Sequence, residues 1–257
     1  MFGERIAEGR VAEVYAWGDR HIVKLWKPGF PPQDAAYEYA IVRNVMDAGI
    51  PTPAALEQTQ VNGRAGIVYE RVDGQTMDRV ALQDLSHLTE MAQQMATLHL
   101  AIHSRNARAL PSQLGKLRAR IARIGLLDAS AKASLIARLD DLPDGEAVCH
   151  GDLHPQNIIM TNEGPVAIDW IDASRGHASI DVARSMLLMQ MLDHYGDVPA
   201  DVKQAVAEFR DGYLNHYLAL SGLPLESISK WLPVLAAARL GEDIPEETDI
   251  LLQMARA

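Results

Sequence analysis

Short runs of apolar residues, each ended by turn residues, fill the first part of the chain. Residues 11–17 and 21–26 form two such runs around Gly18-Asp19, and residues 54–61 and 64–72 form two more around Asn62-Gly63. Runs of this length with glycine-containing turns are typical of antiparallel hairpins. In residues 33–48, by contrast, apolar side chains recur every three or four positions, which is helical spacing. The pattern predicts a small antiparallel sheet with one helix.

From Gly74 onward the spacing becomes mainly helical. Apolar positions from Leu85 to Ile102 predict one long amphipathic helix, and helical spacing also covers residues 111–142, 200–220 and 226–240. Strand-like runs return only at residues 147–149 and 158–168, on either side of a polar loop. The second part of the chain is therefore expected to be mostly helical, with one short strand, a loop and a hairpin inside it.

The polar loop holds the densest cluster of chemical groups in the chain. It reads His150-Gly151-Asp152-Leu153-His154-Pro155-Gln156-Asn157, and Ala167-Ile168-Asp169-Trp170 follows closely. A carboxylate beside a hydroxyl can orient it and accept its proton. An amide and a second carboxylate can hold Mg²⁺ through oxygen atoms. Phosphoryl transfer depends mostly on this kind of positioning and charge neutralisation.

The same loop resembles the catalytic loop of the aminoglycoside phosphotransferase and choline kinase-like enzymes, which are small-molecule relatives of protein kinases. Asp152 and Asn157 keep the Asp-to-Asn spacing of the kinase loop, and Asp169 stands where protein kinases have the Asp of Asp-Phe-Gly. The resemblance implies an α+β, two-lobed protein-kinase-like fold, with a nucleotide-binding lobe at residues 1–72 and a helical lobe at residues 73–257. It implies that Asp152 is the catalytic base and that Asn157 and Asp169 are the Mg²⁺ ligands.

The resemblance also assigns residues to the nucleotide. Lys24 lies inside an apolar strand and needs a partner, for which Glu38 on the predicted helix is the candidate. By resemblance, Lys24 holds the α- and β-phosphates, and the hairpin with Gly9 covers them, although one glycine stands where protein kinases have three. Backbone groups of Glu70 and Val72 would meet the purine, whose identity as ATP or GTP stays open.

Each of these residues also has an ordinary structural interpretation. Gly9 can be a simple turn, Lys24 a solvated residue at a strand edge, Glu38 an exposed helix position and Asp152 a turn residue or helix cap. Structural roles are expected for the histidines and for Asp181, which matches a carboxylate that braces the active-site loop in the family; the histidines concerned are His99, His103, His150 and His154.

Charged residues outside the loop leave the acceptor undecided. The arginines Arg118, Arg120 and Arg123 form either a solvated face or an anionic-substrate patch, and the acidic residues 242–249 form either a solvated face or the wall of a cationic acceptor site. Asp172 lies one position beyond the place where many relatives carry a second acidic residue, so its contact with metal is open. The acceptor and the oligomeric state are not predicted.

Composition excludes several classes of function. Of the 257 residues, 48% are apolar and 23% charged, as in ordinary globular proteins, and the net charge of −10 disfavours a nucleic-acid partner. The single cysteine, Cys149, excludes an intramolecular disulfide, and its apolar surroundings predict a buried strand position. With no signal peptide and no run of about 18 apolar residues, we expect no membrane partner and a cytoplasmic location.

The sequence thus predicts a small-molecule kinase that transfers the γ-phosphoryl group of ATP or GTP to a hydroxyl of a small metabolite or aminoglycoside-type acceptor. A catalytically inactive nucleotide-binding module is one alternative, favoured only by the thin glycine loop. A metallophosphoesterase is the other, because Gly-Asp-Leu-His resembles part of the metal-binding set of that class, but the Gly-Asn-His and Gly-His-x-His steps are missing.

Overall fold

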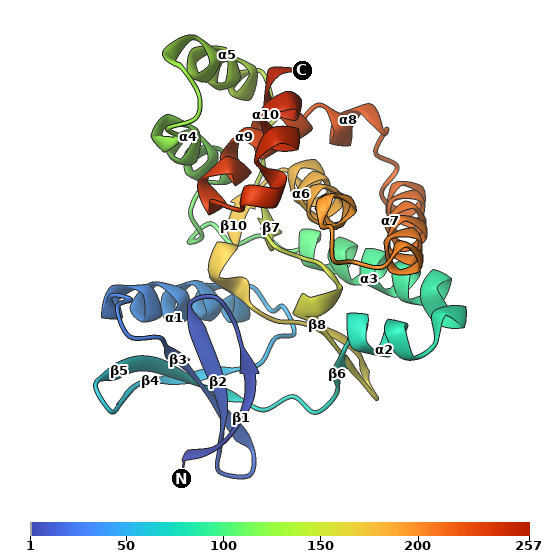
Figure 1. Ribbon diagram of the computed structural model, residues 1–257. Coiled ribbons are helices and arrows are strands. Elements are labelled where there is room, and N and C mark those ends of the chain that lie inside the picture. Colours follow the sequence, from blue (N-terminus) through green and yellow to red (C-terminus); the bar gives the residue numbers. More distant parts are fainter. Residues whose placement is uncertain (1) are drawn as a thin grey trace.

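The first third of the chain forms one antiparallel sheet with a helix packed beside it (Figure 1). The computed structural model describes residues 2–257. The sheet has the order β1-β2-β3-β5-β4, and its members are β1 (Phe2–Glu8), β2 (Ala12–Trp17), β3 (His21–Trp26), β4 (Ala55–Val61) and β5 (Arg64–Glu70). The helix α1 (Pro32–Asp47) connects β3 to β4. The predicted sheet with one helix is confirmed, and β1 adds a strand at its edge.

The β4–β5 turn shows why the sequence folds back at this place. Asn62 and Gly63 have φ values of 52° and 77°, the left-handed conformations that a two-residue hairpin turn requires at both positions. The chain then leaves the sheet at Glu70 and enters the short strand β6 (Gln75–Thr76). We propose that the first lobe ends at residue 72.

The rest of the chain is helical around a small core of strands (Figure 1). The short strand β7 (Ala147–Cys149) pairs with β10 (Ser174–Gly176), and β8 (Ile158–Thr161) pairs with both β6 and β9 (Gly164–Ala167). The helices are α2 (Met77–Gln83), α3 (Leu88–His103), α4 (Gln113–Arg123), α5 (Ala129–Asp140), α6 (Ala178–Met191), α7 (Ala200–Ser221), α8 (Glu226–Ser229), α9 (Leu232–Arg239) and α10 (Thr248–Arg256). Short 3-10 turns are η1 (Leu85–His87), η2 (Pro155–Asn157), η3 (Trp170–Asp172), η4 (Leu192–His194), η5 (Leu240–Glu242) and η6 (Pro245–Glu247).

One local expectation differs from the structure. The helix predicted from Leu85 begins at Leu88, because the Asp84 side chain accepts a hydrogen bond from the Ser86 amide and starts a 3-10 turn first. At the start of α6 the capping side chain is that of His177, whose ring accepts from the Ser179 amide at 3.2 Å. Apolar spacing sets helix faces, but it does not distinguish a first α turn from a 3-10 turn.

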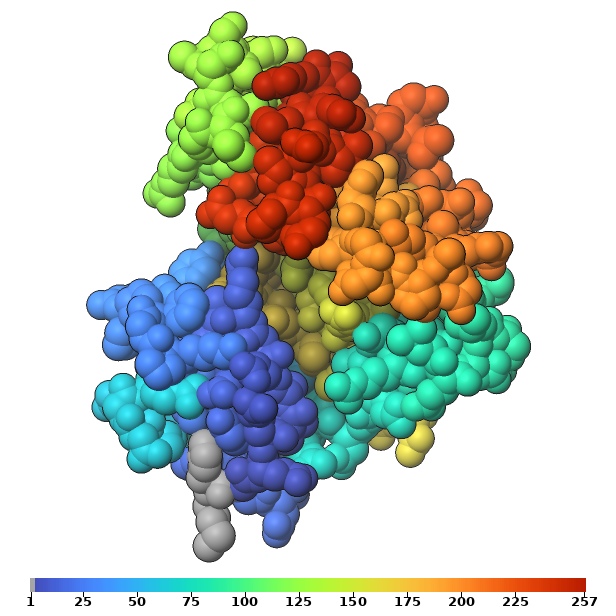
Figure 2. Space-filling model, in the orientation of Figure 1, coloured from blue at the N-terminus to red at the C-terminus, as the bar shows by residue number. Residues whose placement is uncertain are grey.

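One cluster of buried apolar side chains joins the two parts of the molecule. It runs from Trp26 and Ile67 in the sheet to Trp170 in η3 and Trp231 beside α9. Figure 2 shows a recess between the two parts, with the yellow catalytic segment at its floor. At the mouth, Arg10 on the first hairpin donates to the Glu242 carbonyl at 2.9 Å. In residues 2–257, no helix is long and apolar enough to cross a membrane.

Candidate active site

The catalytic loop needs a glycine at one position. Gly151 has φ of +82°, and a Cβ atom there would lie 2.6 Å from the Asp172 carbonyl oxygen. A side chain at this residue would therefore meet both backbone strain and a steric clash. Glycine at this position lets the loop pack closely on Asp172. This packing holds the next residue, Asp152, at the floor of the recess.

Asp181 holds the same loop from beneath. Its carboxylate is fully buried and accepts from the amides of His150 at 2.5 Å and Gly151 at 2.8 Å. It also accepts from the rings of His99 at 2.9 Å and His103 at 3.2 Å. Burial by itself would raise the pKa of Asp181, but the two histidines outweigh it and hold that pKa well below its ordinary value. The contacts fit the bracing role expected for Asp181.

The other ring nitrogens of these two histidines are also engaged. His99 Nδ1 lies 2.6 Å from the Tyr213 hydroxyl, and His103 Nδ1 lies 2.7 Å from the Tyr217 hydroxyl. His99, His103 and Asp181 bring three possible metal-ligand atoms within 4.8 Å of one another. Because hydrogen bonds already satisfy both ring nitrogens and the carboxylate, we interpret the cluster as a buried structural network.

His150 connects the loop to the end of the hairpin. Its Nε2 donates to the Ile168 carbonyl at 3.0 Å, and its Nδ1 accepts from the Asp152 amide at 3.2 Å. The ring is fully buried against Trp170, with centroids 4.4 Å apart. Burial lowers the pKa of His150, which keeps the ring neutral. This geometry fits a bracing residue rather than a reacting one.

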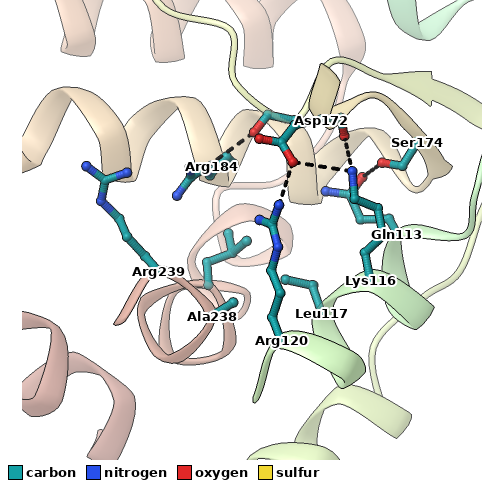
Figure 3. A pocket seen from close by; sticks show the side chains of 11 residues that line it. Gln113, Lys116, Leu117, Arg120, Asp172, Ser174, Arg184, Ala238 and Arg239 are labelled. Carbon is teal, nitrogen blue, oxygen red and sulfur yellow. Dashed lines mark hydrogen bonds and ion pairs between the residues drawn. The ribbon is translucent and has the colours of Figure 1, made fainter. Parts of the chain in front are cut away.

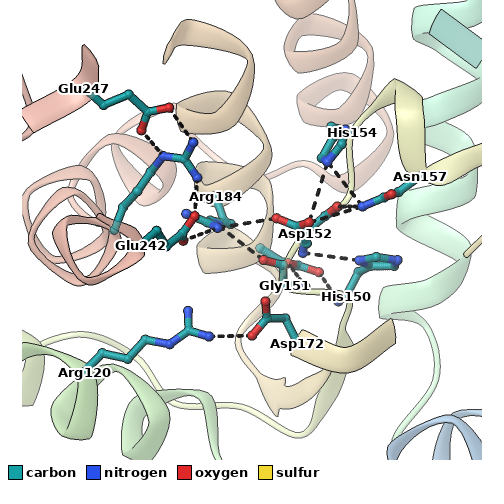
Figure 4. A network of polar contacts seen from close by, with 12 residues as sticks. Arg120, His150, Gly151, Asp152, His154, Asn157, Asp172, Arg184, Glu242 and Glu247 are labelled. Atoms are coloured by element: carbon teal, nitrogen blue, oxygen red, sulfur yellow. Dashed lines mark hydrogen bonds and ion pairs between the residues drawn. The ribbon is translucent and has the colours of Figure 1, made fainter. Parts of the chain in front are cut away.

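Asp152 lies among groups that favour its charged form. Asn157 Nδ2 lies 3.2 Å from its carboxylate, Arg184 lies 3.4 Å away and the His154 ring 3.6 Å away (Figure 4). Burial would raise the pKa of Asp152, but His154 and Arg184 outweigh it and hold that pKa well below its ordinary value. The group is therefore a carboxylate at neutral pH, as it must be to take a proton from a hydroxyl.

Asn157 and Asp169 supply oxygen atoms. Asn157 uses its amide nitrogen to donate to the Asp152 carbonyl at 2.9 Å, which leaves its amide oxygen as the atom able to bind a cation. Asp169 lies two residues beyond the end of β9 in a left-handed conformation, φ 63° and ψ 66°, and its side chain is 42% exposed. An amide oxygen and an accessible carboxylate are an oxygen donor set that fits Mg²⁺.

Lys24 connects the sheet to Asp169. Its ammonium lies 2.9 Å from Asp169 Oδ1 and 2.9 Å from both carboxylate oxygens of Glu38. Burial would lower the pKa of Lys24, but Asp169 and Glu38 reverse this and raise it above its ordinary value. Tyr69 donates to Glu38 at 2.8 Å, so the buried Glu38 has two partners. The expected pairing of Lys24 with Glu38 is present in the structure.

The remaining residues expected at the nucleotide, Gly9, Glu70 and Val72, would contact it through their backbone groups. Gly9 donates its amide to Ala12 O at 2.8 Å within the first hairpin turn, so that amide is already engaged. A Cβ atom at Gly9 would lie 3.6 Å from its nearest neighbour, so space alone does not demand glycine there. The Glu70 amide donates to Ala54 O at 2.9 Å. The contacts of Gly9, Glu70 and Val72 with a nucleotide stay predictions.

A pocket opens beside the catalytic loop. Gly151 and Arg184 line it together with Asp172, and helices α4 and α9 close it (Figure 3). Of the three candidate arginines of α4, only Arg120 lines this pocket, whereas Arg118 pairs with Asp140. Two of the acidic residues 242–249 are paired too: Glu242 lies 2.7 Å from Arg184, and the buried Glu247 is bound by Arg239.

Sequence analysis did not find four of these polar groups: Lys116, Arg184, Arg239 and Tyr69 in its contact with Glu38. Arg184 had a visible signal, because it lies three positions after Asp181 in a helix segment of otherwise apolar and small residues. Lys116 and Arg239 had none, because each belongs to a helix whose position only the tertiary structure determines. Cys149 is fully buried as expected, and burial raises the pKa of its thiol well above the ordinary value.

The fold and the site define a protein-kinase-like phosphotransferase. A model of the phosphotransferase enzyme family matches residues 3–227, so the chain belongs to that family. The membership confirms the resemblance found in the catalytic loop and the expected class of enzyme. It argues against a metallophosphoesterase. No sequence match was found among curated proteins.

Solved aminoglycoside phosphotransferases share the fold over nearly the whole chain. The ADP-bound APH(2'')-Ib has a TM-score of 0.63 at 15% identity, covering 99% of this chain and 92% of that one. The streptomycin–ATP complex of APH(2'')-IIa has a TM-score of 0.61 at 14% identity, and the match covers 98% of this chain and 91% of that one. APH(3'')-Id from Streptomyces rimosus has a TM-score of 0.59 at 20% identity, and the match covers 91% of this chain and 92% of that one. The predicted α+β, protein-kinase-like fold is confirmed.

Proposed function

We propose that the protein transfers the γ-phosphoryl group of ATP or GTP to a hydroxyl group of a small molecule. The observation that carries this proposal is the carboxylate of Asp152, held between Asn157 and Arg184 at the floor of the recess. An ionised carboxylate in this position binds the acceptor hydroxyl, orients it and takes its proton as the phosphoryl group passes in line. Its low basicity fits a proton transfer late in the reaction.

The nucleotide is proposed to bind between the sheet and the catalytic loop. Lys24, fixed by Glu38, donates to the phosphates. Backbone groups of Glu70 and Val72 meet the purine, and the hairpin with Gly9 covers the phosphates. Asn157 and Asp169 would hold Mg²⁺, which when bound neutralises charge on the phosphates. A cytoplasmic location and the absence of a nucleic-acid partner stay predictions.

The experiment is a measurement of ADP and GDP release with Mg²⁺, from ATP and GTP, against a panel of hydroxyl-bearing compounds. Asp152→Asn is compared with Asp211→Asn, a matched control whose carboxylate is exposed on α7 beside Arg210. We expect acceptor-stimulated release that falls roughly a hundredfold or more in Asp152→Asn, the usual contribution of general base catalysis, and is unchanged in the control.

Two outcomes would count against the proposal. Full turnover in Asp152→Asn would remove that residue as the base. Binding of Mg²⁺ and nucleotide without transfer to any hydroxyl compound would favour the inactive nucleotide-binding module.

A further inference from the structure

The pocket beside the catalytic loop lies next to Asp152, because two residues of its wall, Gly151 and Arg184, adjoin that residue. Arg184 lines the pocket and also touches the loop, with its Nε 3.3 Å from the Gly151 carbonyl and a terminal nitrogen 3.4 Å from Asp152 Oδ1. Gly151, the residue next to Asp152, is itself part of the wall. A molecule seated in the pocket therefore lies within one residue of the proposed base.

Most of the charged side chains in the pocket wall are basic. One carboxylate lines it, that of Asp172, against four cations: Lys116, Arg120, Arg184 and Arg239. The cations come from three separate helices, α4, α6 and α9. Figure 3 shows Lys116 and Arg120 converging on Asp172, with Arg184 beside them. The arrangement differs from an ordinary solvated face, where charges of one sign point apart into water.

Each carboxylate at the pocket already has a cationic partner. Asp172 Oδ1 accepts from Arg120 at 2.5 Å and lies 3.4 Å from the Lys116 ammonium. Behind the wall, Glu242 accepts from Arg184 at 2.7 Å and from Arg239 at 2.8 Å. An ammonium group entering the pocket would find no unpaired carboxylate in its wall among the described residues, and it would meet Lys116 and Arg120, two cations that share the single carboxylate of Asp172.

Hydrogen-bond donors, in contrast, remain available. A guanidinium group has five N–H donors, and within residues 2–257 Arg120 makes one hydrogen bond, to Asp172. Its side chain is 39% exposed, so its other donors are accessible from the pocket mouth. Lys116 donates to the Asp172 carbonyl at 2.7 Å and lies 3.4 Å from the Asp172 carboxylate, which leaves one of the three N–H donors of its ammonium group for a ligand.

From this arrangement we infer that the acceptor is a small hydroxylated molecule that carries a carboxylate or phosphate group. The hydroxyl lies at Asp152, and the oxyanion binds Arg120 and Lys116. Charge-assisted hydrogen bonds from a guanidinium to an oxyanion are among the strongest polar contacts in proteins, and they would fix the acceptor's direction in the pocket. The inference rests on the proposed function and narrows its acceptor from any hydroxyl compound to hydroxylated acids.

The test compares acceptors that differ only in charge. Glycerate and glycerol 3-phosphate are titrated against glycerol, with kanamycin as the cationic comparator, into the protein saturated with Mg²⁺ and ADP so that no probe occupies the nucleotide site. The variants are Arg120→Gln, Lys116→Gln and the charge-retaining Arg120→Lys. Arg118→Gln is the matched control, because Arg118 lies on the same helix and pairs with Asp140 outside the pocket. Thermal unfolding of every variant shows that it is folded.

We expect the two acids to bind more tightly than glycerol and kanamycin. Their dissociation constants rise at least tenfold in Arg120→Gln and in Lys116→Gln, rise less in Arg120→Lys and stay unchanged in Arg118→Gln. If glycerate binds more tightly than glycerol 3-phosphate, the pocket selects a carboxylate, and the reverse order indicates a phosphate. In turnover assays the same variants raise the acceptor KM while the nucleotide KM stays constant.

The inference is overturned if neither acid binds better than glycerol, if kanamycin binds more tightly than the acids, or if Arg120→Gln leaves acid binding unchanged. Binding of Mg²⁺ and ATP is measured separately by titration. If the wild-type protein does not bind Mg²⁺ and ATP, the proposed function is overturned. If it binds them and transfers the phosphoryl group to a cationic acceptor, only this inference is overturned.

Discussion

Lys24 and Asp169 lie 145 positions apart in the sequence, and their side chains meet at 2.9 Å between the sheet and the catalytic hairpin. Glu38 holds the other side of the same ammonium, also at 2.9 Å. The strand β3 and the end of β9 are thereby connected by one charged contact in the recess. A cation fixed between two carboxylates at this place is oriented before any nucleotide binds.

Replacing Lys24 tests its proposed contact with the phosphates. Lys24→Met removes a charged donor and leaves Glu38 buried without its cation, so we expect nucleotide affinity to fall by roughly tenfold to a hundredfold, the loss of one charged hydrogen bond. Isothermal titration with Mg²⁺ and ADP measures it. Lys203→Met, which removes a lysine from the exposed part of α7, is the matched control. Unchanged ADP binding in Lys24→Met would refute the assignment.

The metal assignment is tested by the Mg²⁺ requirement of turnover. Asp169→Asn should raise the Mg²⁺ concentration for half-maximal rate by about tenfold or more, because a neutral amide binds a divalent cation more weakly than a carboxylate does. Asn157→Leu, which lacks the amide oxygen, should act in the same direction.

Asp172 provides the comparison for that test. Its carboxylate is held by Lys116 and Arg120, on the acceptor side of Gly151. We therefore expect Asp172→Asn to leave the Mg²⁺ requirement unchanged. An equal shift in Asp172→Asn and Asp169→Asn would mean that both carboxylates bind the metal, and our placement of Asp172 would be wrong.

The candidate site was predictable where its chemistry is local. The spacing of Asp152 and Asn157 lies within one loop, and Asp169 follows the adjacent strand, so a single stretch of sequence carries all three. Lys24 and Glu38 were predictable as a pair for a different reason: a lysine inside an apolar strand needs an acidic partner, and the next helix offered one.

The acceptor pocket was not predictable in the same way. Lys116, Arg184 and Arg239 come from three helices, and apolar periodicity says which face of each helix is buried but not which helices meet. Arg120 was visible as one of several arginines, and nothing in the sequence distinguished it from Arg118. The two differ only in tertiary contacts, with Asp172 for one and Asp140 for the other.

Gly151→Ala is expected to impair both stability and turnover. The substitution brings a Cβ atom against the Asp172 carbonyl and adds strain at a positive φ. Gly18→Ala is the control, because Gly18 also has a positive φ, +68°, but no atom lies within 4 Å of its Cβ position. Strain alone costs about 1–3 kcal/mol, so both variants lose stability in urea unfolding, and Gly151→Ala loses more. If kcat falls equally in both variants, close packing at Gly151 does not position Asp152.

The buried histidine below the loop makes stability depend on pH. Burial and the neighbouring His103 lower the pKa of His99 to about 4 from its ordinary value of 6.5. Between these two values the unfolded chain binds a proton that the folded protein does not, so the free energy of unfolding falls as the pH drops from about 6.5 toward 4. A difference of this size corresponds to about 3 kcal/mol.

Urea unfolding at several pH values between 7 and 4 measures this loss. In His99→Gln the protein should be less stable at pH 7, because Asp181 and Tyr213 lose their ring partner, but its stability should fall by about 3 kcal/mol less over the same pH range. His87→Gln is the control, because His87 is exposed, and this variant should keep the pH dependence of the free energy of unfolding seen in the wild-type protein. If His99→Gln keeps the full wild-type slope, another group is responsible, and the neutral state of His99 beneath the catalytic loop would have to be abandoned.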